Sequence, residues 1–599
     1  MVRALCAPGK KLLILMLVLN VLRTVQPRLA DDEGLPAELV LGLDEDERKR
    51  CGQRRFQQRT IRSAQTGTFL VRYETGGAPG GRIRPAELDA VVARGMTFAF
   101  DVIAEVLELR YVQLRQREEI RGFLAAKGIG VSTGSVSNLS RLGLACLEQT
   151  QQAAAQALGC HYRREVFILQ MDGTHEGGEW CHFVIREGLS DNVLLARKIR
   201  SEHSEDLADM LRHVVKLFGS PDAVVSDMSA AICKAVEAVV PDAPHQLCHF
   251  HFLKAVGIAI LGPEHDAFGY GVRRTRSALR KLRRDCVAKL RKGGMHQKWV
   301  ISLIDRVNEY AGDLSAEGFP FDLPNLMYVQ RCQDALHQIE PWLPCGSKHA
   351  AIATSIDHLY RFRDLLRDYT QSRAGSGTGK IEKRNALFLQ LREILHPVSE
   401  DTHAPLNWGR VEESVRVADM AERLDGFRRK VQRMKARKSL SRGDRKMWRS
   451  LHRMLEKYAD KLNPLLQVRG RSYVLPRTNN LCETGFRDMK RRQRRTTGNG
   501  NLKRQLDHMP AQAFYVENLA DPIYRKIVFR NRPMHECFAE TDWQVVRKTV
   551  KEMKRPPRVG AIDHDLINSD SFFATVRSAF LPASDPSPPV SAKCTILTP

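Results

Sequence analysis

Five short apolar runs between residues 165 and 257 constrain the fold of this chain more than any other feature. Two stretches with helical spacing, His203 to Phe218 and Ala230 to Val240, lie among them. The runs themselves are Glu165 to Met171, Trp180 to Glu187, Asn192 to Ile199, Asp222 to Ser226 and His245 to Phe250. Three consecutive strands followed by alternating helices and strands predict an α/β domain with a mixed sheet covered by helices.

Carboxylates follow two of these predicted strands. Asp172 comes directly after the first strand, and Asp227 ends the fourth. An Asp at a strand end is more often a turn former or a helix cap than a ligand. If the two strands are neighbours, however, both carboxylates meet at one sheet edge, where their oxygens suit Mg²⁺ or Mn²⁺. Two such ions about 3.5 to 4 Å apart suit phosphodiester cleavage.

A third acid stands far along the chain, before a strongly basic helix. Glu483 lies in the run Thr478 to Phe486 and precedes five basic residues among six, namely Lys490, Arg491, Arg492, Arg494 and Arg495. A Glu in a basic helix is usually a solvated ion pair. A metal ligand beside a track of phosphates explains the arrangement better.

The charge balance points to a polyanionic partner. The 599 residues include 94 Lys or Arg and 69 Asp or Glu, so 94 − 69 gives a formal charge of +25. Residues 428 to 449 alone hold eleven basic residues and one acid, Asp444, and such a stretch repels itself unless an anion is near. A chain of this length is expected to form two to four domains.

A helix pair near the N-terminal side resembles a DNA-binding motif. Arg115 to Lys127 is expected to form a helix that Gly128 closes, and Ser132 can cap a second helix. That second helix carries Ser135, Asn138 and Arg141. A helix, a short turn with Gly and a helix rich in small polar residues favour a helix-turn-helix that reads the major groove. A plain helical hairpin explains the pattern almost as well.

The acids lie in short motifs, and a fourth motif follows the second helix of the sheet region. The four are Met171-Asp172-Gly173-Thr174, Ser226-Asp227-Met228-Ser229-Ala230-Ala231, Leu247-Cys248-His249-Phe250-His251, and Thr478-Asn479-Asn480 through Glu483. Together they resemble those of DDE transposases of bacterial insertion sequences, on the branch similar to Mutator-like elements. The resemblance covers roughly residues 85 to 525. It implies an RNase H-like core with two Asp and one Glu, interrupted by an all-helical insertion. The intervals 227 − 172 = 55 and 483 − 227 = 256 leave room for that insertion in the second gap.

The resemblance also implies roles for individual residues. Asp172, Asp227 and Glu483 would bind two Mg²⁺ or Mn²⁺ ions and cut DNA at transposon ends, after which the freed 3′-hydroxyl attacks target DNA. Asn479 and Asn480 would orient the loop of Glu483. Phosphates would be held by Lys490, Arg491 and Arg494. The implied partner is double-stranded DNA, with a homo-oligomer by analogy, a cytoplasmic, nucleoid-associated location in a bacterium, and neither a membrane nor a nucleotide.

Two other patterns are interpreted as structural. Cys248 and His251 could ligate zinc, but no second pair stands nearby at ligand spacing, so a role at a strand-to-helix junction is favoured. Gly375 to Lys380 resembles a phosphate-binding loop, yet Ala374 and Ile381 occupy positions where Gly and Ser or Thr are needed. ATP is therefore not implied.

The ends of the chain are not expected to belong to the folded core. Residues 1 to 30 have the charge order of a signal peptide but lack a good cleavage site, so a poorly ordered extension is the favoured alternative. Thr66 to Arg84 is expected to form a hairpin around a glycine-rich turn, and the tail after Pro556 is expected to be disordered. The expected divisions are an N-terminal extension and hairpin (1–84), a helix-turn-helix region (85–160), the first part of the core (161–257), the helical insertion (258–470), the second part of the core (471–550) and the tail (551–599).

Two alternatives to a transposase remain from the sequence. One is a catalytically silent DNA-binding protein derived from a transposase, in which the basic surface persists without strand cleavage. The other is a nuclease of the same fold, such as a junction resolvase, against which the long helical insertion argues.

Overall fold

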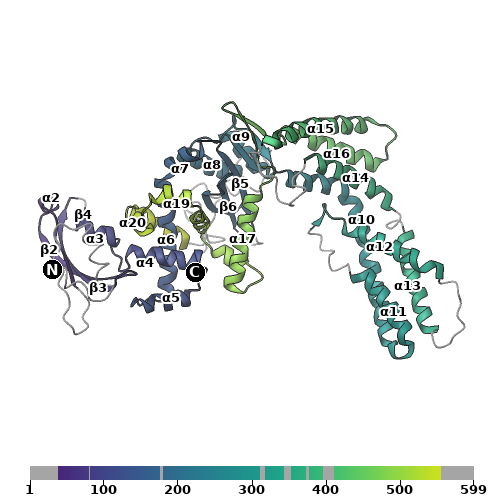
Figure 1. Cartoon of the computed structure of the whole chain (residues 1–599), viewed down its shortest axis with the longest axis horizontal. Coiled ribbons are helices and arrows are strands. Elements are labelled where there is room, and N and C mark those ends of the chain that lie inside the picture. The colour runs from purple at the N-terminus through teal and green to yellow at the C-terminus, as the bar shows by residue number, and fades with distance from the viewer. Residues whose placement is uncertain are drawn as a thin grey trace, which may run out of the picture.

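The protein is an arched molecule with a small sheet at one end, a larger sheet in the middle and a helical arm at the other end (Figure 1). The computed structural model describes residues 38–79, 81–175, 180–309, 318–342, 353–372, 377–395 and 411–554. The expectations for residues 1 to 30 and for almost all of the tail lie outside these residues. Within them, no helix combines the length and apolar character needed to cross a membrane.

The central sheet has five strands in the order β7-β6-β5-β8-β9. They are β5 (Ile168–Thr174), β6 (Cys181–Glu187), β7 (Val193–Ile199), β8 (Ala223–Ser226) and β9 (His245–Leu247). The first three pair antiparallel, whereas β8 pairs parallel with both β5 and β9. All five strands expected from the sequence are present, with ends displaced by up to three residues, and the sheet is mixed as predicted.

Helices cover this sheet so fully that β6 is buried at every position. The helices α8 (Ser204–Phe218) and α9 (Ala230–Val239) match the two expected stretches. α8 packs on β7, as does the 3₁₀ segment η8 (Ala511–Ala520), and α17 (Asn480–Thr497) packs on β5. Strands buried on both faces read as continuous apolar runs, and this is why the sequence identified them.

A second sheet forms the N-terminal end. It consists of β1 (Glu38–Leu41), β2 (Arg54–Ser63), β3 (Gly67–Ala78) and β4 (Gly81–Ile83). The expected hairpin is confirmed by the antiparallel pairing of β3 with β4. Strand β2 was not predicted, because most of its residues are polar and remain at least partly exposed.

The helix pair expected between residues 115 and 141 is present. The first helix is α5 (Arg117–Ala126), and Gly128 follows it in the left-handed region with φ 76°. The second is α6 (Thr133–Ala153), which Ser132 caps by accepting the N–H of Ser135. Next to this pair lie α4 (Phe100–Leu107), the π-helical turn η2 (Glu108–Val112) and α7 (Ala155–Tyr162). The helix α3 (Ala86–Val91) instead packs Leu88 into the core of the N-terminal sheet.

The arm is helical throughout its described residues and has its own apolar core. Its main helix is α10 (His249–Ala288), 40 residues long and therefore about 60 Å. The other helices are α11 (Leu290–Glu309), α12 (Pro324–Ile339), η4 (Glu340–Trp342), α13 (Ala353–Gln371), α14 (Thr378–Leu395), α15 (Val411–Ala436), α16 (Arg442–Tyr458) and η7 (Ala459–Lys461). The boundary expected between residues 257 and 258 falls inside α10, so a continuous helix connects the sheet to the arm.

The chain then returns to the central sheet. A short hairpin of β10 (Leu465–Val468) and β11 (Arg471–Val474) precedes α17, and the remaining helices are α18 (Lys503–His508), α19 (Pro522–Phe529), α20 (Met534–Ala539) and α21 (Trp543–Lys554). Cys482, Phe486 and Met489 of α17 are buried in the same core as the sheet. Gly485 permits this close approach, since a Cβ there would lie 2.2 Å from Nη2 of the buried Arg186.

Candidate active site at the edge of the five-stranded sheet

The parallel pairing of β5 with β8 places two acids side by side. Met171 of β5 pairs with Ser226 of β8, so the next residues, Asp172 and Asp227, stand side by side. Asp227 follows the end of β8 as expected, but Asp172 lies inside β5 and not after it, because β5 continues its pairing with β6 as far as Thr174. The side chain of Asp172 is buried and accepts the N–H of Gly173 over 2.8 Å. Asp227 is partly exposed and accepts the N–H of Ser229 over 2.8 Å.

Glu483 reaches the same edge because the loop before α17 is tied to it. The side-chain amide of Asn479 donates to the carbonyl of Met171 over 3.2 Å, and its backbone N–H donates to Sγ of Cys248 over 3.4 Å. Glu483 follows one turn later and lies 3.5 Å from His251, between its Oε1 and the Nε2 of the imidazole. Asn480 begins the helix, but its side chain is outside the described part of the structure.

The pKa of Asp172 is influenced by the other acids at this edge. Burial holds the pKa of Asp172 well above its ordinary value, and the charges of Asp227, Glu483 and Glu202 raise it further, while the Gly173 N–H lowers it. The three largest charge effects on this carboxyl thus come from other carboxylates. Like charges in a buried site disfavour ionisation of one another unless a cation is present.

Glu202 is a fourth acid at this edge that the sequence interpretation missed. Its carboxylate lies near Asp172, accepts a hydrogen bond from Oγ of Ser229 over 3.3 Å, and has Sγ of Cys181 at 3.8 Å. Burial, then the charges of Glu202 and Asp172, raise the pKa of the Cys181 thiol to about 12. A signal existed, because Glu202 follows the third strand and precedes a helix, as Asp227 does after the fourth.

Cys248 and His251 stand at the junction of β9 and α10. Cys248 is the N-cap of α10 and is buried, and burial raises the pKa of its thiol to about 12. Among the described residues, only His175, Cys181 and Glu202 form a group of three or more ligand-type side chains within 4.8 Å of one another. The pair Cys248 and His251 is not part of such a group.

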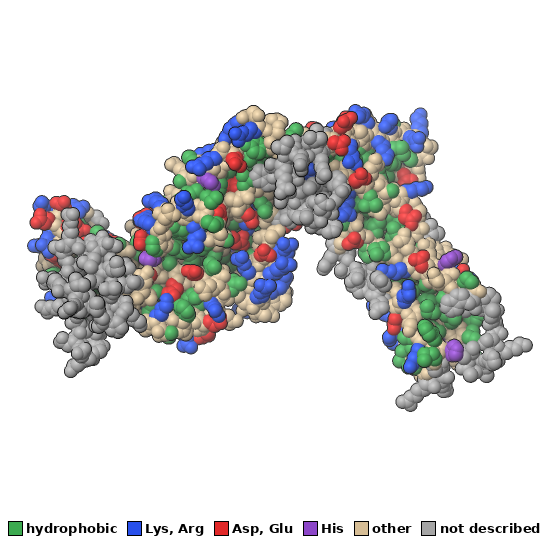
Figure 2. All heavy atoms as spheres, in the orientation of Figure 1, with side chains coloured by type: hydrophobic (Ala, Val, Ile, Leu, Met, Phe, Trp, Pro, Cys, Tyr) green, Lys and Arg blue, Asp and Glu red, His purple; other side chains and the backbone are tan. Residues whose placement is uncertain are grey.

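The basic residues of α17 continue away from the acids on the surface. Arg491 and Arg494 are exposed, Lys490 is partly buried, and Arg491 lies 3.6 Å from Asp488. Figure 2 shows Lys and Arg gathered over the lower part of α17. The helix therefore presents a partly exposed acid in its first turn and cations along its later turns.

The expected recognition residues of α6 lie at its N-terminal half. Asn138 is exposed, whereas Ser135 and Arg141 are partly buried. The helix pair also touches the end of α17, because the side chain of Gln116 donates to the carbonyl of Thr496 over 3.2 Å. The C-terminal half of α6 is buried, so only its first turns are open to a partner.

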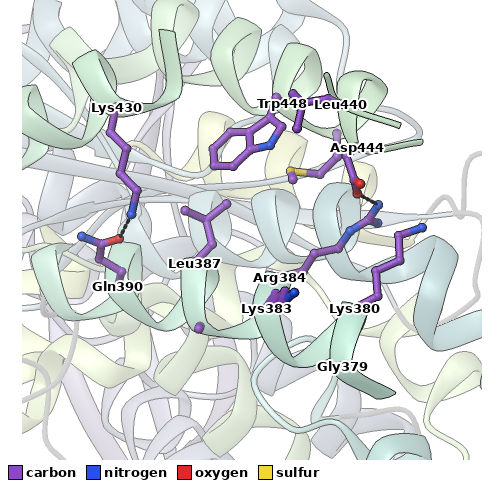
Figure 3. A pocket seen from close by; sticks show the side chains of 12 residues that line it. Gly379, Lys380, Lys383, Arg384, Leu387, Gln390, Lys430, Leu440, Asp444 and Trp448 are labelled. Carbon is purple, nitrogen blue, oxygen red and sulfur yellow. Dashed lines mark hydrogen bonds and ion pairs between the residues drawn. The ribbon is translucent and has the colours of Figure 1, made fainter. Parts of the chain in front are cut away.

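The helical arm handles its charges differently. Arg384 is buried, donates to Asp444 over 2.9 Å, and lies 3.2 Å from Glu264. Arg384 and Asp444 line a cavity of about 520 Å³ between α14 and α16, where Trp448 covers an apolar wall (Figure 3). Trp448 is 8% exposed, as expected for a tryptophan in a core, but Trp299 of α11 is 65% exposed. Lys380, from the rejected phosphate-loop pattern, lies 2.7 Å from Glu264.

Comparison with known proteins places a transposase-type segment within this framework. Residues 179–255, which contain Asp227, Cys248 and His251, match the family described as the MULE transposase domain. A solved structure titled "Drosophila P element transposase strand transfer complex" aligns at 10% identity and a TM-score of 0.31, covering 74% of this chain and 94% of that one. With a TM-score this low, we draw no conclusion about fold or function from the alignment. Among curated proteins, none matches the sequence. The family match therefore supports a transposase and does not by itself assign the catalytic acids.

Proposed function

We propose that the protein is a DDE transposase whose RNase H-like core is the five-stranded sheet and whose catalytic acids are Asp172, Asp227 and Glu483. The observation that carries this proposal is the convergence of the three acids, separated by up to 311 residues, on one sheet edge, where two of them raise the pKa of the third. The MULE transposase match over residues 179–255 supports the same reaction class.

The residues at the edge fit two divalent ions, Mg²⁺ or Mn²⁺. The donors are carboxylate oxygens, which hard cations prefer. The buried carboxylate of Asp172, which the charges of Asp227 and Glu483 disfavour, gains from a cation between them. When bound, the ions supply an activated water and stabilise the leaving oxygen of an in-line displacement. Asp172, Asp227 and Glu483 would hold them.

The neighbouring residues fix these three side chains. The Ser229 N–H holds the carboxylate of Asp227, and Asn479 ties the Glu483 loop to β5. His251, beside Glu483, limits the orientations of that carboxylate. The site is thus built on one strand, the end of its neighbour and the start of a helix, which suits the accuracy that phosphoryl transfer needs.

We infer a DNA track that begins at Glu483 and follows α17. Lys490, Arg491 and Arg494 would hold phosphates, and the link between Gln116 and Thr496 continues this track to the helix-turn-helix. Ser135, Asn138 and Arg141 would contact the duplex from the open end of α6. Strand transfer joins two DNA segments, so a second protomer is part of the proposal.

The direct test is cleavage of a plasmid that carries the sequences flanking the gene. We expect Mg²⁺-dependent nicking, and we expect Asp227→Asn to lower its rate roughly a thousandfold, since a metal ligand worth several kcal/mol costs tenfold per 1.36 kcal/mol. The matched control is Asp209→Asn, an exposed acid on α8 that pairs with Arg212. Equal rates for Asp227→Asn and the wild type would refute the assignment. DNA binding without cleavage by the wild type would favour the catalytically silent alternative.

A further inference from the structure

A second group of ligand-type side chains gathers near the proposed catalytic acids, with a different chemistry. His175 follows β5, Cys181 begins β6 and Glu202 follows β7, so three adjacent strands each contribute one residue. One ligand atom from each lies within 4.8 Å of the other two. The convergence depends on the register of the sheet, in which Thr174 pairs with His182 and Cys181 with Ile199.

The backbone leaves room for this group at Gly173. A Cβ on Gly173 would lie 2.4 Å from Oε1 of Glu202 and 2.7 Å from Sγ of Cys181. Any side chain at this position would therefore push the carboxylate and the sulfur apart. The Ser229 hydroxyl holds the other carboxylate oxygen of Glu202 over 3.3 Å, which fixes its direction.

The donor set selects the class of metal. An imidazole nitrogen, a thiol sulfur and a carboxylate oxygen suit borderline transition metals, above all Zn²⁺, whereas Mg²⁺ prefers an all-oxygen set. Three protein ligands leave a fourth position for water in a tetrahedral site. Cys181 is buried, but His175 is exposed, so the group is open to ions from solvent.

We propose that His175, Cys181 and Glu202 form a Zn²⁺-type site. It is separate from the proposed Mg²⁺ site, whose ligands are all carboxylates. The site stands whether or not the protein cleaves DNA. A cation there offsets the charge of Glu202 beside Asp172. The proposed Zn²⁺ site is also linked to Asp227 through Ser229, whose hydroxyl donates to Glu202 and whose backbone N–H donates to Asp227.

The test uses Co²⁺ as a spectroscopic substitute for Zn²⁺ on the full-length protein after chelation and dialysis. Coordination through Cys181 gives a thiolate-to-cobalt charge-transfer absorption, and we expect it to saturate at one equivalent and to vanish when Zn²⁺ is added. Cys181→Ser should abolish the band. His175→Ala, at an exposed position where folding is not at risk, should weaken Co²⁺ binding at least about tenfold.

Three further variants separate the outcomes. Cys160→Ser, which removes an exposed cysteine elsewhere, should leave the band unchanged. Asp227→Asn should also keep it, so a failure of the catalytic assignment is distinguishable from a failure of this site. A band that persists in Cys181→Ser, or that disappears instead in Cys248→Ser, would overturn the proposal. So would a protein that gives no band with Co²⁺.

Discussion

The edge of the central sheet and the helical arm both bury charged groups, but they treat them in opposite ways. In the arm, the buried Arg384 lies between Asp444 and Glu264, so each charge has an opposite neighbour. At the sheet edge, Asp172 is surrounded by other acids, and their charges raise its pKa. Buried charges are normally paired, because an unpaired one costs several kcal/mol. The unbalanced cluster therefore indicates a place built for a ligand, and the balanced one indicates a place built for stability.

Replacing one acid in each region is the strongest way to break this comparison. We expect Glu483→Gln to lower the Mg²⁺-dependent nicking rate roughly a thousandfold, because it removes a proposed metal ligand. Glu264→Gln in α10 should leave the nicking rate of folded protein unchanged. DNA binding, measured by fluorescence anisotropy, should be retained by both variants. A large loss of nicking in Glu264→Gln would contradict the distinction.

Removing the cation of the arm should instead affect stability. Arg384→Ala leaves Asp444 and Glu264 without their buried partner, and we expect this to destabilise the arm by about 3 kcal/mol. Denaturant unfolding, followed by hydrogen exchange in α10, α14 and α16, measures the effect. Arg429→Ala is the matched control, since Arg429 is exposed and pairs along its own helix with the exposed Asp425. Equal losses in the free energy of unfolding for Arg384→Ala and Arg429→Ala would show that the burial of Arg384 does not contribute to the stability of the arm.

The cations of α17 are expected to contribute to binding rather than to catalysis or folding. Arg491→Ala combined with Arg494→Ala should weaken DNA binding about tenfold, and it should lower the slope of log K against log salt by about 2. Anisotropy titrations at several salt concentrations measure both quantities. A matched double variant, Arg280→Ala with Arg284→Ala on α10, tests whether removing any two exposed arginines weakens DNA binding and lowers the salt slope to the same extent. Equal slopes for these two double variants would place the phosphate track elsewhere.

The smallest effect is a gain in stability. With a pKa above its ordinary value, the Asp172 carboxyl in the folded protein keeps a proton that the unfolded chain has lost. Its contribution to stability is therefore full below the ordinary pKa of Asp and is lost as pH rises through the raised pKa. In the absence of metal, Asp172→Asn should stabilise the central region by about 1 kcal/mol at neutral pH and less at low pH.

Thermal unfolding in chelator across a pH series measures this gain, and Asp209→Asn is again the control. The same argument predicts that Mn²⁺ binds the wild type more tightly as pH rises, because the ion has to displace that proton. Stability that falls in Asp172→Asn at neutral pH would contradict the unbalanced cluster.

The sequence predicted the central sheet well for a physical reason. Its strands are buried on both faces, so their apolar runs stand out, and Asp172 and Asp227 were found because they follow such runs. Strand β2 was missed because most of its exposed positions carry polar and charged side chains. Surface strands are defined by their pairing with neighbours, which composition does not reveal.

The remaining parts of the site depended on contacts between distant segments. Glu483 was singled out by the basic run that follows it and then by the family resemblance, but no local pattern predicted the contact of Asn479 with Met171 that brings its loop to the sheet. Glu202 was missed although it follows a predicted strand, because it stands three residues beyond the end of that strand. The group of His175, Cys181 and Glu202 was equally invisible, as its spacing follows the sheet register and matches no linear motif.

The length of α10 has a mechanical consequence. Its first turn carries His251 beside Glu483, and the same helix runs on through the arm. Because α10 is one continuous helix, a rotation of the arm about the helix axis would also rotate the imidazole of His251. Pro263 lies twelve positions after His251 and cannot donate a backbone hydrogen bond within the helix. It is therefore the position at which α10 bends most easily.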